Sequence, residues 1–317
     1  MLPLLLALAV SAPAADSAIR PALMPWPRSV TWNAGALRLD SSFTVTVAGR
    51  SDPRLERALE RTLKRLGRRT GIAFSATIAR GGSGTLVVRA TAAGPAVPEL
   101  SQDESYALTV TPTGAALDAP TTVGVIRGVE TLLQLVAADS AGYYLPAATI
   151  TDAPRFRWRG LLLDVGRHFE PVEVVERTLD GMALGKLNVL HWHLSDDQGF
   201  RVESRRYPRL QQFGSDGLYY TQEQIRAVVD YAADRGIRVV PEFDMPGHST
   251  SWFVGYPQYA SGKGPYAIQR TWGVFDPAFD PTRESVYQFL DGFIGEMSGL
   301  FPDAFWHIGG DEVPGTE

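Results

Sequence analysis

The chain has 317 residues, of which 44% are hydrophobic, and a formal net charge of −5 at pH 7. This length allows a large buried core, arranged as two domains or one large one. The acidic balance argues against nucleic-acid binding, which generally needs a basic face, and the absence of cysteine excludes disulfides, thiolate nucleophiles and cysteine-ligated metals.

The N-terminus has the pattern of a secretory signal. An apolar run over residues 2–10 is followed by the small residues Ser11, Ala12 and Ala14, although no lysine or arginine precedes Arg20. We expect residues 1–19 to be a signal peptide and leader, and the protein to be secreted or periplasmic. No later window has the roughly 18 apolar residues of a spanning helix, so we expect no membrane span.

Residues 20–152 have the pattern of a small mixed α/β domain. Apolar and β-branched runs between glycine, serine or proline predict strands at 43–47, 85–88 and 106–110. One helix is expected to begin at Asp52-Pro53 and to stop at Gly67, and another to span 125–136. Glutamates interleave with the basic residues of the first helix, Arg57 and Arg61 among them, which predicts a solvated face.

From residue 153 to residue 317 strands and helices alternate. Strands are expected at 161–163, 189–194, 237–243 and 305–308, and helices at 172–184, 221–234 and 284–297. This order predicts a parallel sheet with right-handed crossovers, either a barrel or a doubly wound sheet. Each predicted strand ends in a charged or histidine-bearing cluster, which favours the barrel. Because eight strands and about 250 residues make a full barrel, we expect an incomplete (β/α)8 TIM barrel of about four strands, with its second half absent.

The most informative cluster is the pair Asp311-Glu312, which follows Gly309-Gly310 where the last predicted strand opens into a loop. Neighbours on an extended chain point to opposite faces. The two carboxylates of a usual retaining glycosidase instead approach to about 5 Å from separate elements. We therefore expect one carboxylate to act on a leaving oxygen while the other holds a different part of the substrate.

Four segments carry a family resemblance: RGLLLDVGRHF (159–169), LNVLHWHLSDDQG (187–199), PEFDMPGH (241–248) and HIGGDEV (307–313). In this order and spacing they resemble glycoside hydrolase family 20, the β-N-acetylhexosaminidases. Residues 20–152 resemble the α/β domain that precedes the barrel in this family. Two positions depart from its pattern, since Phe200 stands where tryptophan is frequent and Gly166 where serine is common.

The resemblance implies retaining, substrate-assisted hydrolysis of terminal β-linked N-acetylhexosamine, without a cofactor or a metal, from an oligosaccharide or glycoconjugate. In this mechanism the substrate's own 2-acetamido carbonyl is the nucleophile, an exception to the two-carboxylate rule. Glu312 would be the general acid and then the base, and Asp311 would orient the acetamido group. Substrate-binding or pocket-shaping roles are implied for four further residues: Arg167, Asp196, Asp244 and His248.

Two other functions fit the sequence. His191 and His193 lie two apart on a predicted strand and so share a face, which allows a metal-dependent hydrolase; the family resemblance implies instead that they are structural. An incomplete barrel also exposes apolar strand edges, which allows a carbohydrate-binding fragment without catalysis.

Overall fold

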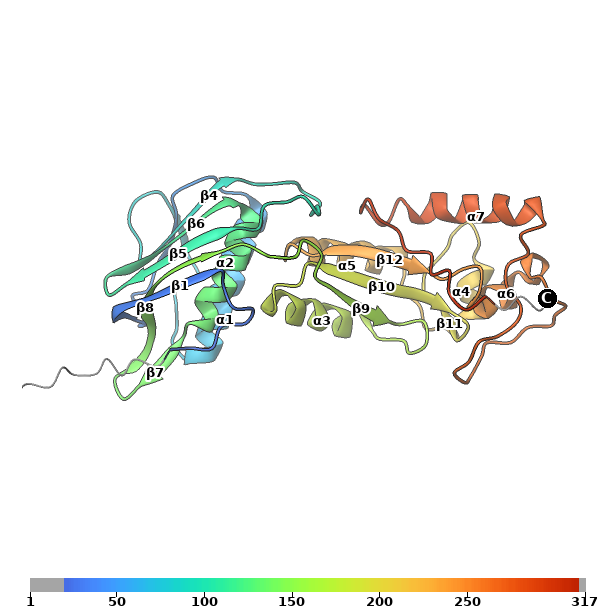
Figure 1. Ribbon diagram of the computed structural model, residues 1–317, viewed down its shortest axis with the longest axis horizontal. Helices are drawn as coiled ribbons and strands as arrows, with labels where there is room; N and C mark the ends of the chain where they lie inside the picture. The colour runs from blue at the N-terminus through green and yellow to red at the C-terminus, as the bar shows by residue number, and fades with distance from the viewer. Residues whose placement is uncertain (1–19, 314–317) are drawn as a thin grey trace, which may run out of the picture.

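The computed structural model describes residues 20–313, so the predicted signal peptide and leader lie outside the described residues. These residues form two units that lie end to end (Figure 1). The first unit contains a mixed sheet and two helices, and the second contains a parallel sheet with helices around it. Between residues 20 and 313, no helix combines the length and apolar character that a membrane crossing requires.

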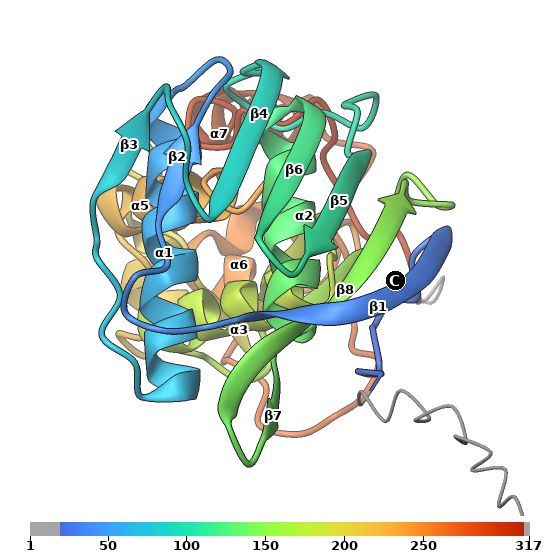
Figure 2. The ribbon, with the colours of Figure 1, turned by 90° about the vertical axis from the view of Figure 1, so that its left-hand side faces the viewer.

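The first unit is built on an eight-stranded sheet in the order β1-β8-β5-β6-β4-β2-β3, with β7 paired to β8. Its strands are β1 (Ser29–Arg38), β2 (Val45–Val47), β3 (Ile78–Arg80), β4 (Leu86–Ala92), β5 (Tyr106–Thr111), β6 (Gly114–Thr121), β7 (Ala137–Asp139) and β8 (Gly142–Asp152). Helices α1 (Pro53–Thr70) and α2 (Thr122–Gln134) lie on the face of the sheet that is turned toward the second unit (Figure 2). The prediction of a mixed α/β domain is confirmed.

Helix α1 begins where its sequence predicts and ends later. The Asp52 side chain accepts hydrogen bonds from the backbone N–H groups of Arg54 and Leu55, which caps the first turn. The predicted stop at Gly67 is wrong: the helix continues to Thr70, and Gly71, at φ 73°, ends it in the left-handed conformation that glycine adopts without strain.

The basic face of α1 is not simply solvated, because it holds the second unit. Arg57 donates two hydrogen bonds of 2.7 Å to the carboxylate of Asp234, and Arg61 donates to the Asp234 carbonyl at 2.7 Å. The prediction of a solvated face is therefore wrong for these two residues. Interleaved charges in sequence do not reveal which of them meet a partner from another domain.

The second unit has a parallel sheet in the order β9-β10-β12, and β11 pairs antiparallel with the end of β10. Its elements are β9 (Gly160–Asp164), α3 (Val172–Leu184), β10 (Val189–Asp196), β11 (Gly199–Phe200), α4 (Arg209–Gly214), α5 (Gln222–Ala233), β12 (Arg238–Phe243), α6 (Thr250–Gly255), the 3-10 helix η1 (Pro257–Tyr259) and α7 (Glu284–Met297). The sheet does not close on itself, as expected for a partial barrel.

The prediction of a fourth strand at 305–308 is wrong, because this segment is not a regular strand. The segment lies beside β12, where His307 N donates to Pro241 O at 3.0 Å, but it forms one isolated bridge, between His307 and Glu242. Pro241 has no N–H to extend the ladder. No described strand covers the other side, and Phe305 and Ile308 are 48% and 53% exposed.

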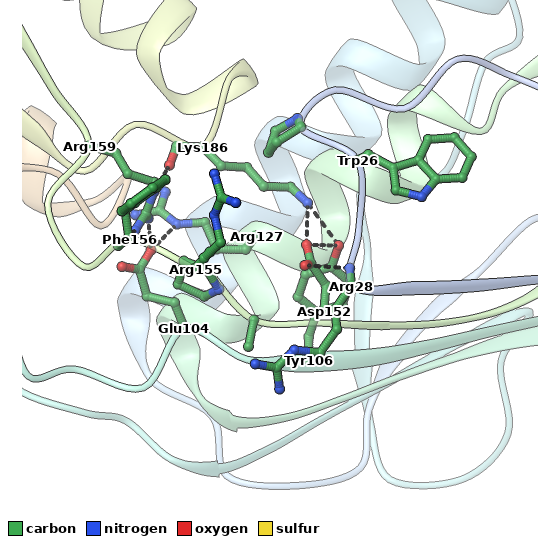
Figure 3. A pocket seen from close by; sticks show the side chains of 13 residues that line it. Trp26, Arg28, Glu104, Tyr106, Arg127, Asp152, Arg155, Phe156, Arg159 and Lys186 are labelled. Carbon is green, nitrogen blue, oxygen red and sulfur yellow. Dashed lines mark hydrogen bonds and ion pairs between the residues drawn. The ribbon is translucent and has the colours of Figure 1, made fainter.

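A buried polar network joins the two units. The Arg127 guanidinium, on α2, donates to Glu104 at 2.6 Å and to the Gly236 carbonyl at 2.7 Å. Glu104 also accepts from Arg159 and Asn188, which directly precede strands β9 and β10 of the second unit. Beside this network is a hollow of about 490 Å³ that lies between the units (Figure 3). It is near the start of β9, and not at the carboxyl ends of the second unit's strands. Burial raises the pKa of Glu104, but the two arginines outweigh burial and hold it below its ordinary value.

Candidate functional site

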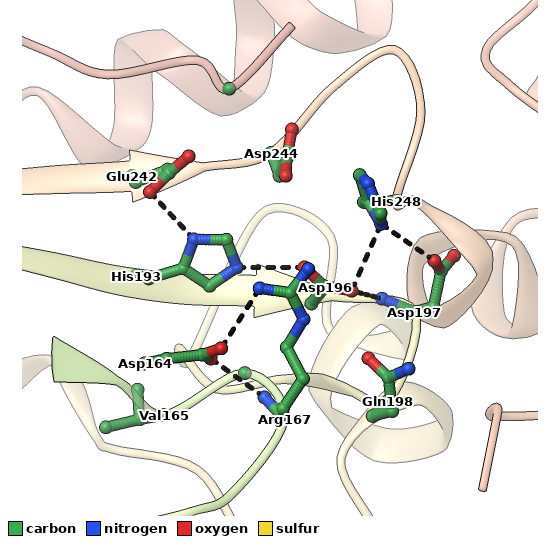
Figure 4. Close-up of polar contacts among 12 residues, drawn as sticks. Asp164, Val165, Arg167, His193, Asp196, Asp197, Gln198, Glu242, Asp244 and His248 are labelled. Atoms are coloured by element: carbon green, nitrogen blue, oxygen red, sulfur yellow. Dashed lines mark hydrogen bonds and ion pairs between the residues drawn. The ribbon is translucent and has the colours of Figure 1, made fainter. Parts of the chain in front are cut away.

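The predicted site residues come from the carboxyl ends of neighbouring strands, where a parallel sheet gathers its loops. Arg167 follows β9, Asp196 ends β10, and Asp244 follows β12 (Figure 4). His248 lies in the loop after β12, before α6. The structure brings these residues together with Asp311 and Glu312 as one cluster.

Arg167 is held by two carboxylates. Its Nη1 lies 3.0 Å from Asp164 Oδ2 and its Nη2 lies 2.7 Å from Asp196 Oδ2. Burial lowers the pKa of Arg167, but the charges of Asp196 and Asp164 outweigh burial and raise it. The guanidinium is therefore fixed in one orientation, with its Cζ 5.8 Å from the centre of the Trp272 ring.

His248 connects the acidic pair to the sheet. Its Nε2 lies 3.0 Å from Glu312 Oε2 and 3.8 Å from Asp311 Oδ2, while its Nδ1 lies 3.1 Å from Asp197 Oδ2. Hydrogen bonds to Asp196 and Asp197 raise the pKa of His248 to about 11. The imidazolium therefore has an N–H to donate at each end.

The expectation that Asp311 and Glu312 point to opposite faces is wrong. Glu312 has φ 48°, a left-handed conformation that turns the chain, so both carboxylates lie within 4 Å of the same imidazole nitrogen. Both side chains are more than half exposed. The pair can thus address one bound molecule from the same side.

Asp244 lies beneath the turn that carries this pair. It is 2% exposed, and the Gly310 N–H points at its Oδ1 from 3.4 Å. Burial, and then the charge of Asp311, raise the pKa of Asp244 to about 7. A carboxyl group with this pKa changes its protonation state near neutral pH.

The sequence reasoning missed Asp164, Asp197 and Glu242 as members of the cluster. Asp197 accepts from both the N–H and the hydroxyl of Thr250, at 2.9 and 2.6 Å, which ties His248 to the start of α6. Glu242 faces His193 in the register of β12 against β10. The spacing of His191 and His193 was a signal for such a partner, but only the strand register identifies it.

The structure also bears on the metal-site alternative. His193 Nδ1 lies 2.7 Å from Glu242 and its Nε2 lies 3.0 Å from Asp196, so both ring nitrogens are hydrogen-bonded to carboxylates. His191, Glu242 and His307 bring one ligand atom each within 4.8 Å of one another. His191 Nε2 already lies 2.6 Å from Glu242 Oε2, so a cation there has to displace a hydrogen bond.

Comparison with known proteins assigns both units. The model for the catalytic domain of glycosyl hydrolase family 20 matches residues 156–317, and the model for domain 2 of that family matches residues 20–153. Beta-hexosaminidase subunit beta of Mus musculus is 47% identical over 220 residues, which are 68% of this chain and 40% of that protein. The chain thus spans less than half the length of this curated relative.

Two solved structures are similar to the chain over nearly its whole length. Flavobacterium johnsoniae chitobiase has a TM-score of 0.88 and 44% identity, over 92% of this chain and 44% of that one. A mutant Streptomyces plicatus beta-hexosaminidase in complex with the product GlcNAc has a TM-score of 0.81 and 32% identity, over 94% of this chain and 61% of that one.

Proposed function

Because the chain belongs to glycoside hydrolase family 20, we propose that the protein hydrolyses terminal, non-reducing β-linked N-acetylhexosamine in oligosaccharides or glycoconjugates. The reaction retains the anomeric configuration and uses the substrate's 2-acetamido group as the nucleophile. The observation that carries this proposal is the convergence of Asp311 and Glu312 on His248 at the strand ends. The relative crystallised with GlcNAc supports an amino-sugar substrate.

Glu312 is the proposed general acid and base. His248 Nε2 holds Glu312 Oε2, while Oε1 has no hydrogen bond to another described residue. The free oxygen can protonate the glycosidic oxygen and later take a proton from water. Holding one oxygen fixes the direction of the other, and proton transfer depends on that geometry.

Asp311 is the proposed partner of the acetamido N–H. Its carboxylate is 62% exposed, and no other described residue donates a hydrogen bond to it. An acceptor at this place orients the acetamido carbonyl toward the anomeric carbon. It also stabilises the positive charge that develops on the cyclic oxazolinium intermediate. Two neighbouring carboxylates therefore do different work on one sugar.

Arg167, Asp196 and Asp244 complete the proposed site. A guanidinium fork suits adjacent sugar hydroxyls, and Arg167 is already fixed by Asp164 and Asp196. Asp244, as a buried carboxyl under the turn, tunes the charge next to Asp311. His248 has the same supporting role toward Glu312.

The test is hydrolysis of an aryl β-N-acetylglucosaminide and its de-acetylated analogue by the purified chain. We expect cleavage of the acetylated substrate only, and a loss of about 10²- to 10⁴-fold in Glu312→Gln because general acid catalysis is removed. Glu223→Gln, at an exposed carboxylate on α5, is the matched control and should retain full activity. Equal rates on both substrates would contradict substrate assistance. Binding of N-acetylglucosamine without turnover would favour the carbohydrate-binding alternative.

We also propose that the protein is secreted or periplasmic, on the basis of the apolar run and small residues before Arg20. Expression of the chain in a bacterial host, followed by cell fractionation and N-terminal sequencing, tests this location. An exported product that begins near Ala15 is the expected result. A product that stays in the cytoplasm with Met1 in place would contradict it.

A further inference from the structure

We propose that Glu242 and His193 are positioning residues, which fix Asp196 and, through it, the orientation of Arg167 and His248. This inference rests on the proposed function, since the groups that it positions are those assigned to the sugar. Neither Glu242 nor His193 is required to touch substrate. Their role is to hold the part of the site that does.

Glu242 is buried beneath the site and meets three imidazoles. Its Oε2 lies 2.6 Å from His191 Nε2 and 2.7 Å from His193 Nδ1, and its Oε1 lies 3.0 Å from His307 Nδ1. The side chain is 5% exposed. Burial raises the pKa of Glu242, but hydrogen bonds to His191 and His193 outweigh burial and hold it well below its usual range. The Glu242 carboxylate is thus a buried anion that His191 and His193 of β10 both face, and it is available to orient the His193 ring.

His193 is clamped between two carboxylates. Its Nδ1 faces Glu242 and its Nε2 faces Asp196 Oδ2 at 3.0 Å, on opposite sides of the ring (Figure 4). Two ionised acceptors are satisfied together only when both ring nitrogens carry a proton. Burial lowers the pKa of His193, but hydrogen bonds to Asp196 and Glu242 outweigh burial and raise the pKa to about 10. The ring is therefore an imidazolium that joins the two anions.

Asp196 passes this constraint to the site. It is fully buried, and its Oδ2 lies 3.0 Å from His193 Nε2 and 2.7 Å from Arg167 Nη2. Its Oδ1 accepts the Asp197 N–H at 2.7 Å and lies 3.5 Å from His248 Nδ1. Because both oxygens are engaged, the carboxylate has one orientation, and that orientation fixes where the Arg167 and His248 donors point.

The charges around His193 come from several elements. Asp164 faces it from the end of β9, Asp196 from its own strand, and Glu242 and Asp244 from β12 and the residue that follows. All four are carboxyl groups. Removal of the Glu242 charge therefore leaves His193 with fewer anions, and its proton should be lost at lower pH.

The experiment compares Glu242→Gln with the wild-type chain in two independent readouts. The first is NMR of the histidine ring nitrogens, with the His193 signal assigned from its loss in His193→Gln. We expect the wild-type ring to be an imidazolium at pH 8, and the ring in Glu242→Gln to be neutral there. This readout does not depend on turnover, so it decides the positioning role even if the proposed hydrolase activity fails.

The second readout is hydrolysis of the aryl β-N-acetylglucosaminide across pH. We expect kcat/KM to fall by roughly 10- to 100-fold in Glu242→Gln, because small misplacements of binding groups have costs of this size, and its pH profile to shift. Glu296→Gln is the control for folding, because Glu296 is hydrogen-bonded to Ser204 and Gln222 away from the strand ends. It should keep wild-type activity. A wild-type His193 that is neutral at pH 8, or a Glu242→Gln variant as active as Glu296→Gln, would overturn the proposal.

Discussion

The carboxylate of Asp244 occupies the space that a side chain at Gly309 would need. A Cβ built on Gly309 falls 1.7 Å from Asp244 Oδ1, and the residue has φ 69°. Close approach to a buried carboxyl group thus explains Gly309, whereas Gly310 has nothing within 4 Å of an added Cβ and is explained by its φ of 94° alone. The neighbour that requires glycine at position 309 is therefore a protein side chain.

Gly309→Ala should therefore damage both stability and the site. The alanine methyl group meets Asp244 while the backbone is strained, and the loop with Asp311 and Glu312 has to move. Gly217→Ala is the matched control, because Gly217 has φ 78° with nothing within 4 Å. We expect the control to lose about 1 kcal/mol from left-handed strain alone, and Gly309→Ala to lose more, measured by urea unfolding. Equal losses would show that the contact with Asp244 has no cost.

Asp244 should also give the protein a pH-dependent stability. Its pKa is raised from 3.8 to about 7. Between these values the folded state holds a proton that the unfolded state has lost, so the free energy of unfolding falls as pH rises from about 4 to 7. Asp244→Asn removes this term, and the difference between variant and wild type should change by up to about 4 kcal/mol over that window. Parallel stability curves for the two proteins would contradict the raised pKa.

Glu104→Gln should destabilise the contact between the two units. The buried Arg127 and the partly buried Arg159 lose their anion, and an unpaired buried charge costs about 3 to 5 kcal/mol. Asp139→Asn removes the partner of Arg38 in an exposed pair and should change the stability little, because solvent screens such pairs. Thermal unfolding of both variants checks the contrast. Because the folded pKa of Glu104 is lowered, the wild-type advantage should be lost as pH falls below its ordinary value of 4.5.

Chelation distinguishes the proposed mechanism from the metal-dependent alternative. We expect hydrolysis of the aryl β-N-acetylglucosaminide to be unchanged after dialysis against EDTA. Both ring nitrogens of His193 are hydrogen-bonded to carboxylates, so neither is free to bind a metal ion. Loss of activity that zinc restores would favour the metal site. The variant His191→Gln then tests which residues hold the ion.

Much of the second unit was predictable from sequence. Helices α3 and α7 have the predicted bounds, because their apolar residues recur at helical spacing over more than three turns. The parallel strands predicted that their polar ends converge, and the family resemblance singled out Arg167, Asp196 and Asp244 among the residues there. In the first unit β1 was missed, since most of its residues are exposed or half-buried and so give no clean alternation.

The contacts that depend on one backbone angle or on strand register were not predictable. The positive φ of Glu312 reverses the simple face rule for Asp311 and Glu312. The partnership of His193 with Glu242 depends on the register of β10 against β12, over a separation of 49 residues. Local sequence patterns determine neither the backbone angle of one residue nor the register between two distant strands.

Strand β9 has a practical consequence for handling the polypeptide. Among the described residues it pairs with β10 alone, and Leu161 and Leu162 are 40% and 52% exposed. Free amide and carbonyl groups beside solvent-facing leucines offer a template to which a foreign extended chain can add. Concentrated solutions of the isolated chain should therefore aggregate through the unpaired edge of β9. Dilute, cold preparations are the right starting material for every measurement above.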